Sequence, residues 1–344
     1  MIERDIMQPS NSRKTEPKRI GVLLINLGTP DNFTYWPMRR YLKEFLWDRR
    51  VIETNRVLWW IILNGIILTT RPRTSGHAYE KIWNRERNES PLKTITRAQS
   101  EALGESLQNS KGISVDWAMR YGNPPIAERL RALMEQGHER LLLVPLYPQY
   151  SAATTATALD KAYEALSKMR WQPAIRTLPP YYDEPGYIDA LADSVRTHID
   201  KLGWKPDRIL ASFHGLPQAY VERGDPYYRH CMETARLLAE ALRLGDDQFS
   251  VVFQSRFGKA EWLKPYADIT TAELAQNGCR HLLTVCPGFS ADCVETLEEI
   301  GIGLRQTFLD NGGKKFSVVP CLNASSPSVR MLSDLIRREL AGWI

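Results

Sequence analysis

The sequence has few cysteines and none of the best-known nucleotide or hydrolase motifs. Its five cysteines are an odd number, and no two are spaced C-x-x-C. The spacing of Cys279, Cys286 and Cys293 does not match zinc or iron–sulfur ligands. We interpret the cysteines as buried thiols of a reducing compartment. The chain lacks a G-x-G-x-x-G fingerprint, a P-loop and a G-x-S-x-G elbow, so no dinucleotide, nucleotide or serine-hydrolase site is indicated.

A leader peptide and a clustered basic face are also missing. Residues 1–17 are polar and charged, so we expect a disordered N-terminal arm and a cytoplasmic protein. The net charge of +5 is mild, and basic residues alternate with acidic ones along most of the chain. This distribution argues against nucleic-acid binding, which needs a concentrated basic surface.

The longest apolar run is VLWWIILNGIIL at residues 57–68, and arginines flank it on both sides. It is too short to cross a bilayer, because a spanning helix needs roughly 20 apolar residues. From the residues alone, two interpretations stay open. The run is either a buried core helix or a half-exposed hydrophobic lip that places Trp59 and Trp60 at an interface.

The two halves of the sequence resemble each other in three pairs of segments that occur in the same order. We therefore predict an internal duplication. The first half is the longer one, and its surplus lies in residues 33–100, which contain the apolar run. The pairs are GVLLINLGTP (21–30) with RILASFHGLP (208–217), MRYGNP (119–124) with SRFGKA (255–260), and YPQYSAATTAT (147–157) with CPGFSADCVET (286–296).

In each half, short apolar runs alternate with helical patterns, which predicts βαβ units and parallel sheets. The expected fold class is therefore α/β, with two similar doubly wound domains. We assign residues 18–175 plus 324–344 to the first domain and 176–323 to the second. The last helix, 326–340, is expected to pack back on the first domain. Ligands of such sheets bind at the carboxyl ends of the strands.

A histidine stands at one of these strand ends. His214 follows the apolar run ILASF and precedes a Gly-Leu-Pro turn, whereas Leu27 has the equivalent place in the first half. A single histidine is usually structural. At a strand end beside carboxylates, however, an imidazole can bind a divalent metal or transfer protons near neutral pH.

The neighbouring strand end leads into an acidic helix, predicted to start near residue 291. Asp292, Glu295 and Glu299 share one helix face by their i, i+3, i+7 spacing. Acidic residues near a helix N-terminus also have an ordinary explanation in the helix dipole. Because the first half lacks acids at the equivalent positions, we favour a functional role for the stripe.

Read in order, the motifs LLINLGTP, RYGNP, YPQYS, SFHGLP, RGDPY and FSADCVETLEE resemble those of ferrochelatases. The resemblance runs from about residue 18 to the C-terminus. It implies two Rossmann-like domains of the chelatase type, related by a pseudo-twofold axis. It also implies insertion of Fe²⁺ into protoporphyrin IX with release of two protons, which yields protohaem in the terminal step of haem biosynthesis.

The resemblance carries roles to individual residues. His214 and Glu295 correspond to the catalytic and metal-binding pair. Our hypothesis is that His214 accepts pyrrole protons while Glu295 helps to bring in Fe²⁺; which of the two contacts iron first is left open by the sequence. Asp292 and Glu299 correspond to an acidic path for protons and metal. The porphyrin contacts that it implies are Arg120, Tyr121, Phe289, Tyr79, Ser90 and Trp59.

The resemblance also bears on cofactors and partners. We expect no tightly bound cofactor and no [2Fe–2S] cluster, since no cysteine follows Cys321; Fe²⁺ enters as a substrate. The apolar run now favours the lip, with peripheral attachment to the inner face of the membrane and a transient contact with the preceding haem-pathway enzyme. The insertion favours protoporphyrin over coproporphyrin. A cobalt or nickel chelatase and a porphyrin carrier without turnover are the alternatives.

Overall fold

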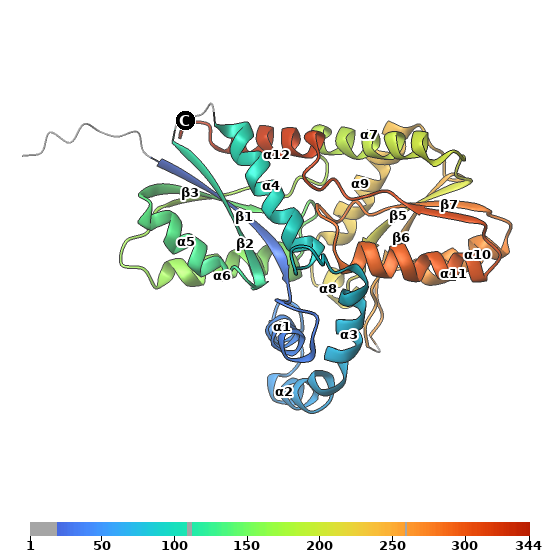
Figure 1. Cartoon of the computed structure of the whole chain (residues 1–344), viewed down its shortest axis with the longest axis horizontal. Helices are drawn as coiled ribbons and strands as arrows, with labels where there is room; N and C mark the ends of the chain where they lie inside the picture. Colours follow the sequence, from blue (N-terminus) through green and yellow to red (C-terminus); the bar gives the residue numbers. More distant parts are fainter. Residues whose placement is uncertain (1–18, 109–111, 259) are drawn as a thin grey trace, which may run out of the picture.

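The computed structural model describes residues 19–108, 112–258 and 260–344, so the arm predicted at 1–17 lies outside the described residues. The chain forms two four-stranded parallel sheets with the orders β2-β1-β3-β4 and β6-β5-β7-β8. Figure 1 shows the sheets following one another along the long axis of the molecule, each with helices packed around it.

The chain enters the first sheet, leaves it for a helical insertion, and then completes it before building the second sheet. We call the insertion, residues 33–90, the lip. Segments labelled η are π-helices. The first sheet and its helices are β1 (Arg19–Thr29), α4 (Pro91–Leu107), β2 (Ile113–Gly122), α5 (Ile126–Glu135), β3 (His138–Pro145), η2 (Ala152–Ala156), α6 (Thr157–Ser167) and β4 (Ala174–Thr177). The lip contains α1 (Tyr35–Trp47), α2 (Arg56–Ile62), η1 (Leu63–Ile67) and α3 (Leu68–Ile82).

The second half repeats this plan. Its elements are α7 (Pro185–Leu202), β5 (Arg208–His214), α8 (Gln218–Glu222), α9 (Tyr227–Leu242), β6 (Phe249–Gln254), α10 (Ala267–Gln276), β7 (His281–Val285), η3 (Glu295–Leu304), α11 (Arg305–Asp310), β8 (Lys315–Val318) and α12 (Ser326–Glu339). The three predicted segment pairs lie on β1 and β5, at the ends of β2 and β6, and after β3 and β7. These strands have the same places in the two sheets, which confirms the predicted duplication.

The strand sequences explain why helices cover both faces of each sheet. In β1, Ile20, Val22 and Leu24 belong to one apolar cluster, whereas Leu23 and Ile25 belong to another. Alternate side chains of a strand point to opposite faces, so a continuous apolar run needs cover on both. Helices α4 and α12 contribute to the first cluster, and α5 and α6 to the second. Helix α12 packs against both α4 and α7.

The lip has an apolar cluster of its own, and the run at 57–68 is half exposed, as one of the two interpretations predicted. The placement of Trp59 at the interface is wrong, because this side chain is 6% exposed and its indole N–H donates to the Leu46 carbonyl at 2.7 Å. Within the described ranges, no helix has both the length and the apolar character to span a membrane. The exposed apolar side chains of the run are Val57, Leu58, Trp60, Ile61 and Ile66.

The pairing of β1 with β2 in the first sheet depends on a glycine. Gly28 has φ +110°, and a Cβ atom there would lie 1.8 Å from the Tyr121 carbonyl oxygen of the paired strand. We expect Gly28→Ala to lower the free energy of unfolding by about 3 kcal/mol, through backbone strain and separation of the strands. Urea unfolding measures the effect.

Gly104→Ala provides the matched control. Gly104 lies inside α4, and nothing is within 4 Å of a Cβ atom built there. This variant should gain about 0.5–1 kcal/mol, because alanine has the higher helix propensity. Equal effects of the two substitutions would contradict our account of Gly28.

Candidate active site

His214 is the last residue of β5, a central strand of the second sheet. Its Nδ1 atom lies 2.6 Å from the carbonyl oxygen of Gly215. Because a carbonyl oxygen only accepts hydrogen bonds, Nδ1 must carry the proton. The neutral imidazole therefore has a free lone pair on Nε2, where it can accept a proton or bind a metal.

The backbone around this histidine is fixed from two sides. The Gly215 N–H donates to the Gln254 carbonyl at 2.7 Å, and the Tyr227 hydroxyl donates to the His214 carbonyl at 3.0 Å. A Cβ atom on residue 215 would lie 2.7 Å from the Gln254 oxygen. The glycine after the histidine is thus required by close approach to the neighbouring strand.

The acidic segment after β7 differs from the predicted helix. The helix begins at Val294 rather than near residue 291, and Glu295–Leu304 is π-helical. π-Helical turns are closed by i→i+5 hydrogen bonds and are frequent at functional sites. Glu295 and Glu299 lie in this helix. The prediction that Asp292 shares its face is wrong, because Asp292 precedes the helix.

Asp292 is instead the centre of a buried turn. Its Oδ1 atom accepts hydrogen bonds from the Thr296 hydroxyl at 2.9 Å and from the Cys321 N–H at 3.3 Å. Its Oδ2 atom accepts from the Asn323 side-chain amide at 2.7 Å. The carboxylate therefore ties the start of η3 to the segment that follows β8.

Glu299 is a carboxyl group with an unusual environment. One oxygen accepts from the Ser255 N–H at 2.7 Å, and the other accepts from the Ser255 hydroxyl. Burial raises its pKa most strongly; the Ser255 bonds and the charge of His214 oppose this, whereas Glu295 adds to it. The net result is a raised pKa, so this group exchanges protons closer to neutrality than an ordinary glutamate.

Glu295 lies on the side of the lip. Burial and then the charge of Glu295 raise the pKa of Tyr79. The pKa of Tyr41 is raised by burial, by Tyr79 and by Glu295. These tyrosines come from α3 and α1, and a Lys81–Glu298 ion pair of 2.7 Å joins α3 to η3. The structure thus brings Glu295, Glu299 and His214 together with Tyr79, and it adds Tyr41, which sequence reasoning missed.

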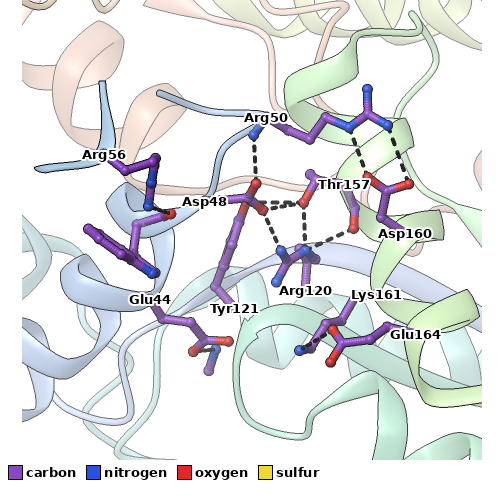
Figure 2. A network of polar contacts seen from close by, with 12 residues as sticks. Glu44, Asp48, Arg50, Arg56, Arg120, Tyr121, Thr157, Asp160, Lys161 and Glu164 are labelled. Atoms are coloured by element: carbon purple, nitrogen blue, oxygen red, sulfur yellow. Dashed lines mark hydrogen bonds and ion pairs between the residues drawn. The ribbon is translucent and has the colours of Figure 1, made fainter. Parts of the chain in front are cut away.

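The predicted pair Arg120 and Tyr121 belongs to a buried network of the first half (Figure 2). Arg120 pairs with Asp48 and donates to the Thr157 carbonyl at 3.0 Å, while its guanidinium stacks 4.2 Å from the centre of the Tyr121 ring. The Tyr121 hydroxyl donates to Asp48 at 2.8 Å. The network fixes the end of β2 against the lip and α6.

Asp48 has a lowered pKa within this network. Burial acts to raise it, but hydrogen bonds from Thr157, from the Arg50 N–H and from Tyr121, together with the charge of Arg120, lower it overall. The sequence did not mark Asp48 as a network residue, because its side-chain partners Arg120, Tyr121 and Thr157 are far along the chain.

The other predicted porphyrin contacts have different surroundings. Ser90 is 1% exposed and is the N-cap of α4, where its hydroxyl accepts from the Lys93 N–H at 3.3 Å. Phe289 follows β7 and is partly buried against the apolar clusters of the second sheet. With Trp59 in the core of the lip, the roles of these three residues in porphyrin binding stay predictions.

The acids and the histidine offer few ligands to a metal ion. Among the residues that the structure describes, there is no group of three or more His, Cys, Asp and Glu side chains placed to hold a metal ion. His214 and Glu295 can each offer a single ligand. Such a donor set is suited to a metal ion in transit, because firm binding needs more ligands in a defined geometry.

Solved structures place the fold among the chelatases. SirB from Bacillus subtilis with Fe³⁺ is 11% identical, with a TM-score of 0.58, over 94% of this chain and 96% of that one. A multi-domain protein from Deinococcus radiodurans is described as structurally similar to chelatases. It is 13% identical, with a TM-score of 0.53, over 92% of this chain and 54% of that one. The chain therefore has the chelatase fold, which confirms the predicted fold class.

Sequence comparisons identify the family within the chelatase fold. The family model for ferrochelatase matches residues 19–340. Proteins named ferrochelatase from Agrobacterium fabrum and Brucella ovis are 55% and 54% identical over 336 and 343 residues, which cover 98% and 100% of this chain and 98% and 97% of theirs. The chain belongs to the ferrochelatase family, as the motifs indicated, and it is an enzyme that inserts iron into a porphyrin in haem biosynthesis.

The buried Asp48 network predicts a pH-dependent stability. We expect Asp48→Asn to lower the free energy of unfolding by about 3 kcal/mol at neutral pH, since Arg120 loses its buried partner. A lowered folded-state pKa stabilises the fold above the unfolded pKa, about 4. This contribution is lost as the pH falls through the folded-state value, so the difference between wild type and variant should shrink in acid.

Urea unfolding over a series of pH values measures this difference. Asp160→Asn is the control, because Asp160 pairs with Arg50 on the surface, with side chains 53% and 45% exposed. We expect it to change stability by at most about 1 kcal/mol. A wild-type-to-Asp48→Asn difference that does not vary with pH would rule out the charged network as its source.

Proposed function

We propose that this ferrochelatase inserts Fe²⁺ into protoporphyrin IX, with His214 as the base and Glu295 as the carboxylate that receives the iron. The observation that carries the proposal is the Nδ1–H bond from His214 to the Gly215 carbonyl, which leaves Nε2 free to accept a proton. Metallation removes two N–H protons from the ring, so a base at this position is needed twice in each turnover.

Proton transfer continues from His214 to Glu299. The first pyrrole proton goes to Nε2 and produces an imidazolium, which the neighbouring carboxylate stabilises. The raised pKa of Glu299 then allows this group to take the proton over. His214 returns to its neutral form and accepts the second proton. The two ring nitrogens left without protons provide the negative charges that bind Fe²⁺.

Glu295 is the proposed entry point for the metal. A carboxylate is an acceptable ligand for Fe²⁺, and a site with few protein ligands releases it readily to the four ring nitrogens. Asp292 was expected on the same path. Because both of its oxygens already accept hydrogen bonds, we propose that it supports the start of η3 and acts on the path only indirectly.

The ring is proposed to lie between the two halves' strand ends and the lip. Tyr79, near Glu295, is the contact best supported by its position. Arg120 and Tyr121 are proposed to line the first-half wall through their network, and Phe289 the second-half wall. The apolar lip favours protoporphyrin over coproporphyrin, since two vinyl groups replace two propionates. Ser90 and Trp59 are proposed to act through α4 and the core of the lip.

Metallation assays test the role of His214. We expect His214→Ala to lower the rate of anaerobic Fe²⁺ insertion about 10³-fold, within the range of general-base effects, with porphyrin binding largely retained. The loss of porphyrin fluorescence reports insertion, and protoporphyrin and coproporphyrin are compared side by side. His77→Ala, which changes an exposed histidine of α3, is the control.

An unchanged rate in His214→Ala would show that the histidine serves only the turn. A wild-type protein that binds porphyrin without turnover would support a carrier instead. Faster insertion into coproporphyrin would overturn the assigned substrate while leaving the role of the histidine intact.

We also propose that the protein is cytoplasmic and that its lip attaches peripherally to the inner face of the membrane. Its exposed apolar residues lie on α2 and η1. The Arg56 guanidinium stacks 3.8 Å from the centre of the Trp47 ring beside them. Apolar side chains next to arginines are typical of peripheral attachment to anionic lipid. The same surface is proposed to meet the preceding enzyme of the pathway transiently.

Vesicle binding tests this surface. We expect Trp60→Glu to weaken co-sedimentation with anionic phospholipid vesicles about tenfold or more. The substitution removes a large apolar side chain from the bilayer contact and adds a negative charge that the anionic lipid repels. Trp171→Glu is the control, since Trp171 is similarly exposed and follows α6 of the first half. Identical binding by the two variants would exclude the lip as the contact surface.

Turnover is proposed to need no iron–sulfur cluster. The cysteine spacing supports this, because Cys279, Cys286 and Cys293 lie seven residues apart, which does not match iron–sulfur ligand motifs. The metal is therefore a substrate in this proposal.

A further inference from the structure

The turn after β3 in the first half is hydrogen-bonded to the start of α9 in the second half. The Asp225 carboxylate accepts the Ser151 hydroxyl at 2.9 Å and the Ala152 N–H at 2.8 Å on one oxygen. The Tyr150 N–H lies 3.2 Å from His230 Nδ1. Tyr150 and Ser151 belong to the YPQYS motif and Asp225 to the RGDPY motif, and the proposed reaction uses neither motif.

The same segment also reaches His214. The other oxygen of Asp225 accepts the Tyr227 N–H at 3.0 Å, and the Tyr227 hydroxyl donates to the His214 carbonyl at 3.0 Å. A continuous line of hydrogen bonds therefore runs from Ser151 and Ala152 of the first half, through Asp225 and Tyr227, to the peptide that carries the proposed base.

We propose that Asp225 and Tyr227 are positioning residues, which hold the His214 peptide in register with the turn after β3. This inference rests on the proposed role of His214. The base stands on one half and part of the ring-binding wall on the other, so their relative placement has to be maintained by contacts between the halves. Small displacements of reacting groups lower the rate of the chemical step strongly. These hydrogen bonds are therefore expected to raise kcat in addition to stabilising the fold.

The chemistry of Tyr227 fits this role. Tyr227 is 8% exposed within the main apolar cluster, and its hydroxyl is the atom that reaches the His214 carbonyl. Burial raises its pKa, so the hydroxyl stays a neutral donor at working pH. Tyr227→Phe removes this donor and keeps the packing of the ring, which separates positioning from core stability.

Steady-state kinetics test the proposal. We expect Tyr227→Phe to lower kcat about 5- to 20-fold with the KM values for porphyrin and Fe²⁺ changed less than about twofold. Tyr181→Phe is the matched control. Tyr181 is 1% exposed in the same cluster, and its hydroxyl has no hydrogen-bond partner within the described part of the chain. Its kcat should stay at the wild-type value.

Two results would overturn the proposal. One is a kcat for Tyr227→Phe equal to that of the control, and the other is a raised KM with kcat unchanged. His214→Ala is measured in parallel. If His214→Ala is inactive while Tyr227→Phe has the wild-type kcat, the positioning role is wrong and the role of His214 stands. If His214→Ala is active, the proposed function itself is wrong.

A spectroscopic readout does not depend on turnover. In protein labelled with ¹⁵N-histidine, the imidazole signals of His214 are assigned by their loss in His214→Ala. Tyr227→Phe should shift or broaden them, and Tyr181→Phe should not. Asp225→Asn, which weakens the same line one step further from the base, should alter them as well. Unchanged His214 signals in both Tyr227→Phe and Asp225→Asn would contradict a positioning role.

Discussion

The hydrogen bond from the His214 imidazole to the Gly215 carbonyl is the constraint on which the proposed catalytic geometry depends. It selects one tautomer and points one nitrogen away from the chain. The bond exists only because the strand ends at this residue and the next one is a glycine, which fits against the Gln254 carbonyl of the adjacent strand. A parallel strand that ends in a glycine turn thus fixes the orientation of the proposed base.

Two buried carboxyl groups have opposite net pKa shifts: burial acts to raise the pKa of both, and their hydrogen-bond partners and neighbouring charges decide the outcome. Asp48 is surrounded by donors and a guanidinium, so it remains charged and holds the lip to the first sheet. Glu299 accepts hydrogen bonds from Ser255 and a long one from the Gln254 side-chain amide, with no guanidinium beside it and a like charge nearby, so its neutral form is favoured. The first group provides rigidity, whereas the second can change its protonation state at little cost.

Much of the fold could be predicted because it follows from short-range patterns. The segment pairs marked equivalent strands, and the apolar runs marked strands with both faces covered. The position of Asp292 could not be predicted, since spacing in an α-helix was assumed where the chain forms a π-helix that starts later. The run at 57–68 showed an apolar helix but not its rotation, so Trp59 was assigned to the face that Trp60 occupies. Asp48 and Tyr41 contribute through contacts between distant segments, which a single sequence does not reveal.

Both halves contain a π-helix directly after their third strand: Ala152–Ala156 follows β3, and Glu295–Leu304 follows β7. The first is built from alanine and threonine and carries no acid. The wide helical turn is therefore shared by the two copies, while the glutamates occur in only one. In evolutionary terms, the simplest history is that the irregular backbone existed before the gene duplicated. The acids were then acquired on a turn that already had the right shape, and the other copy kept that turn as a scaffold.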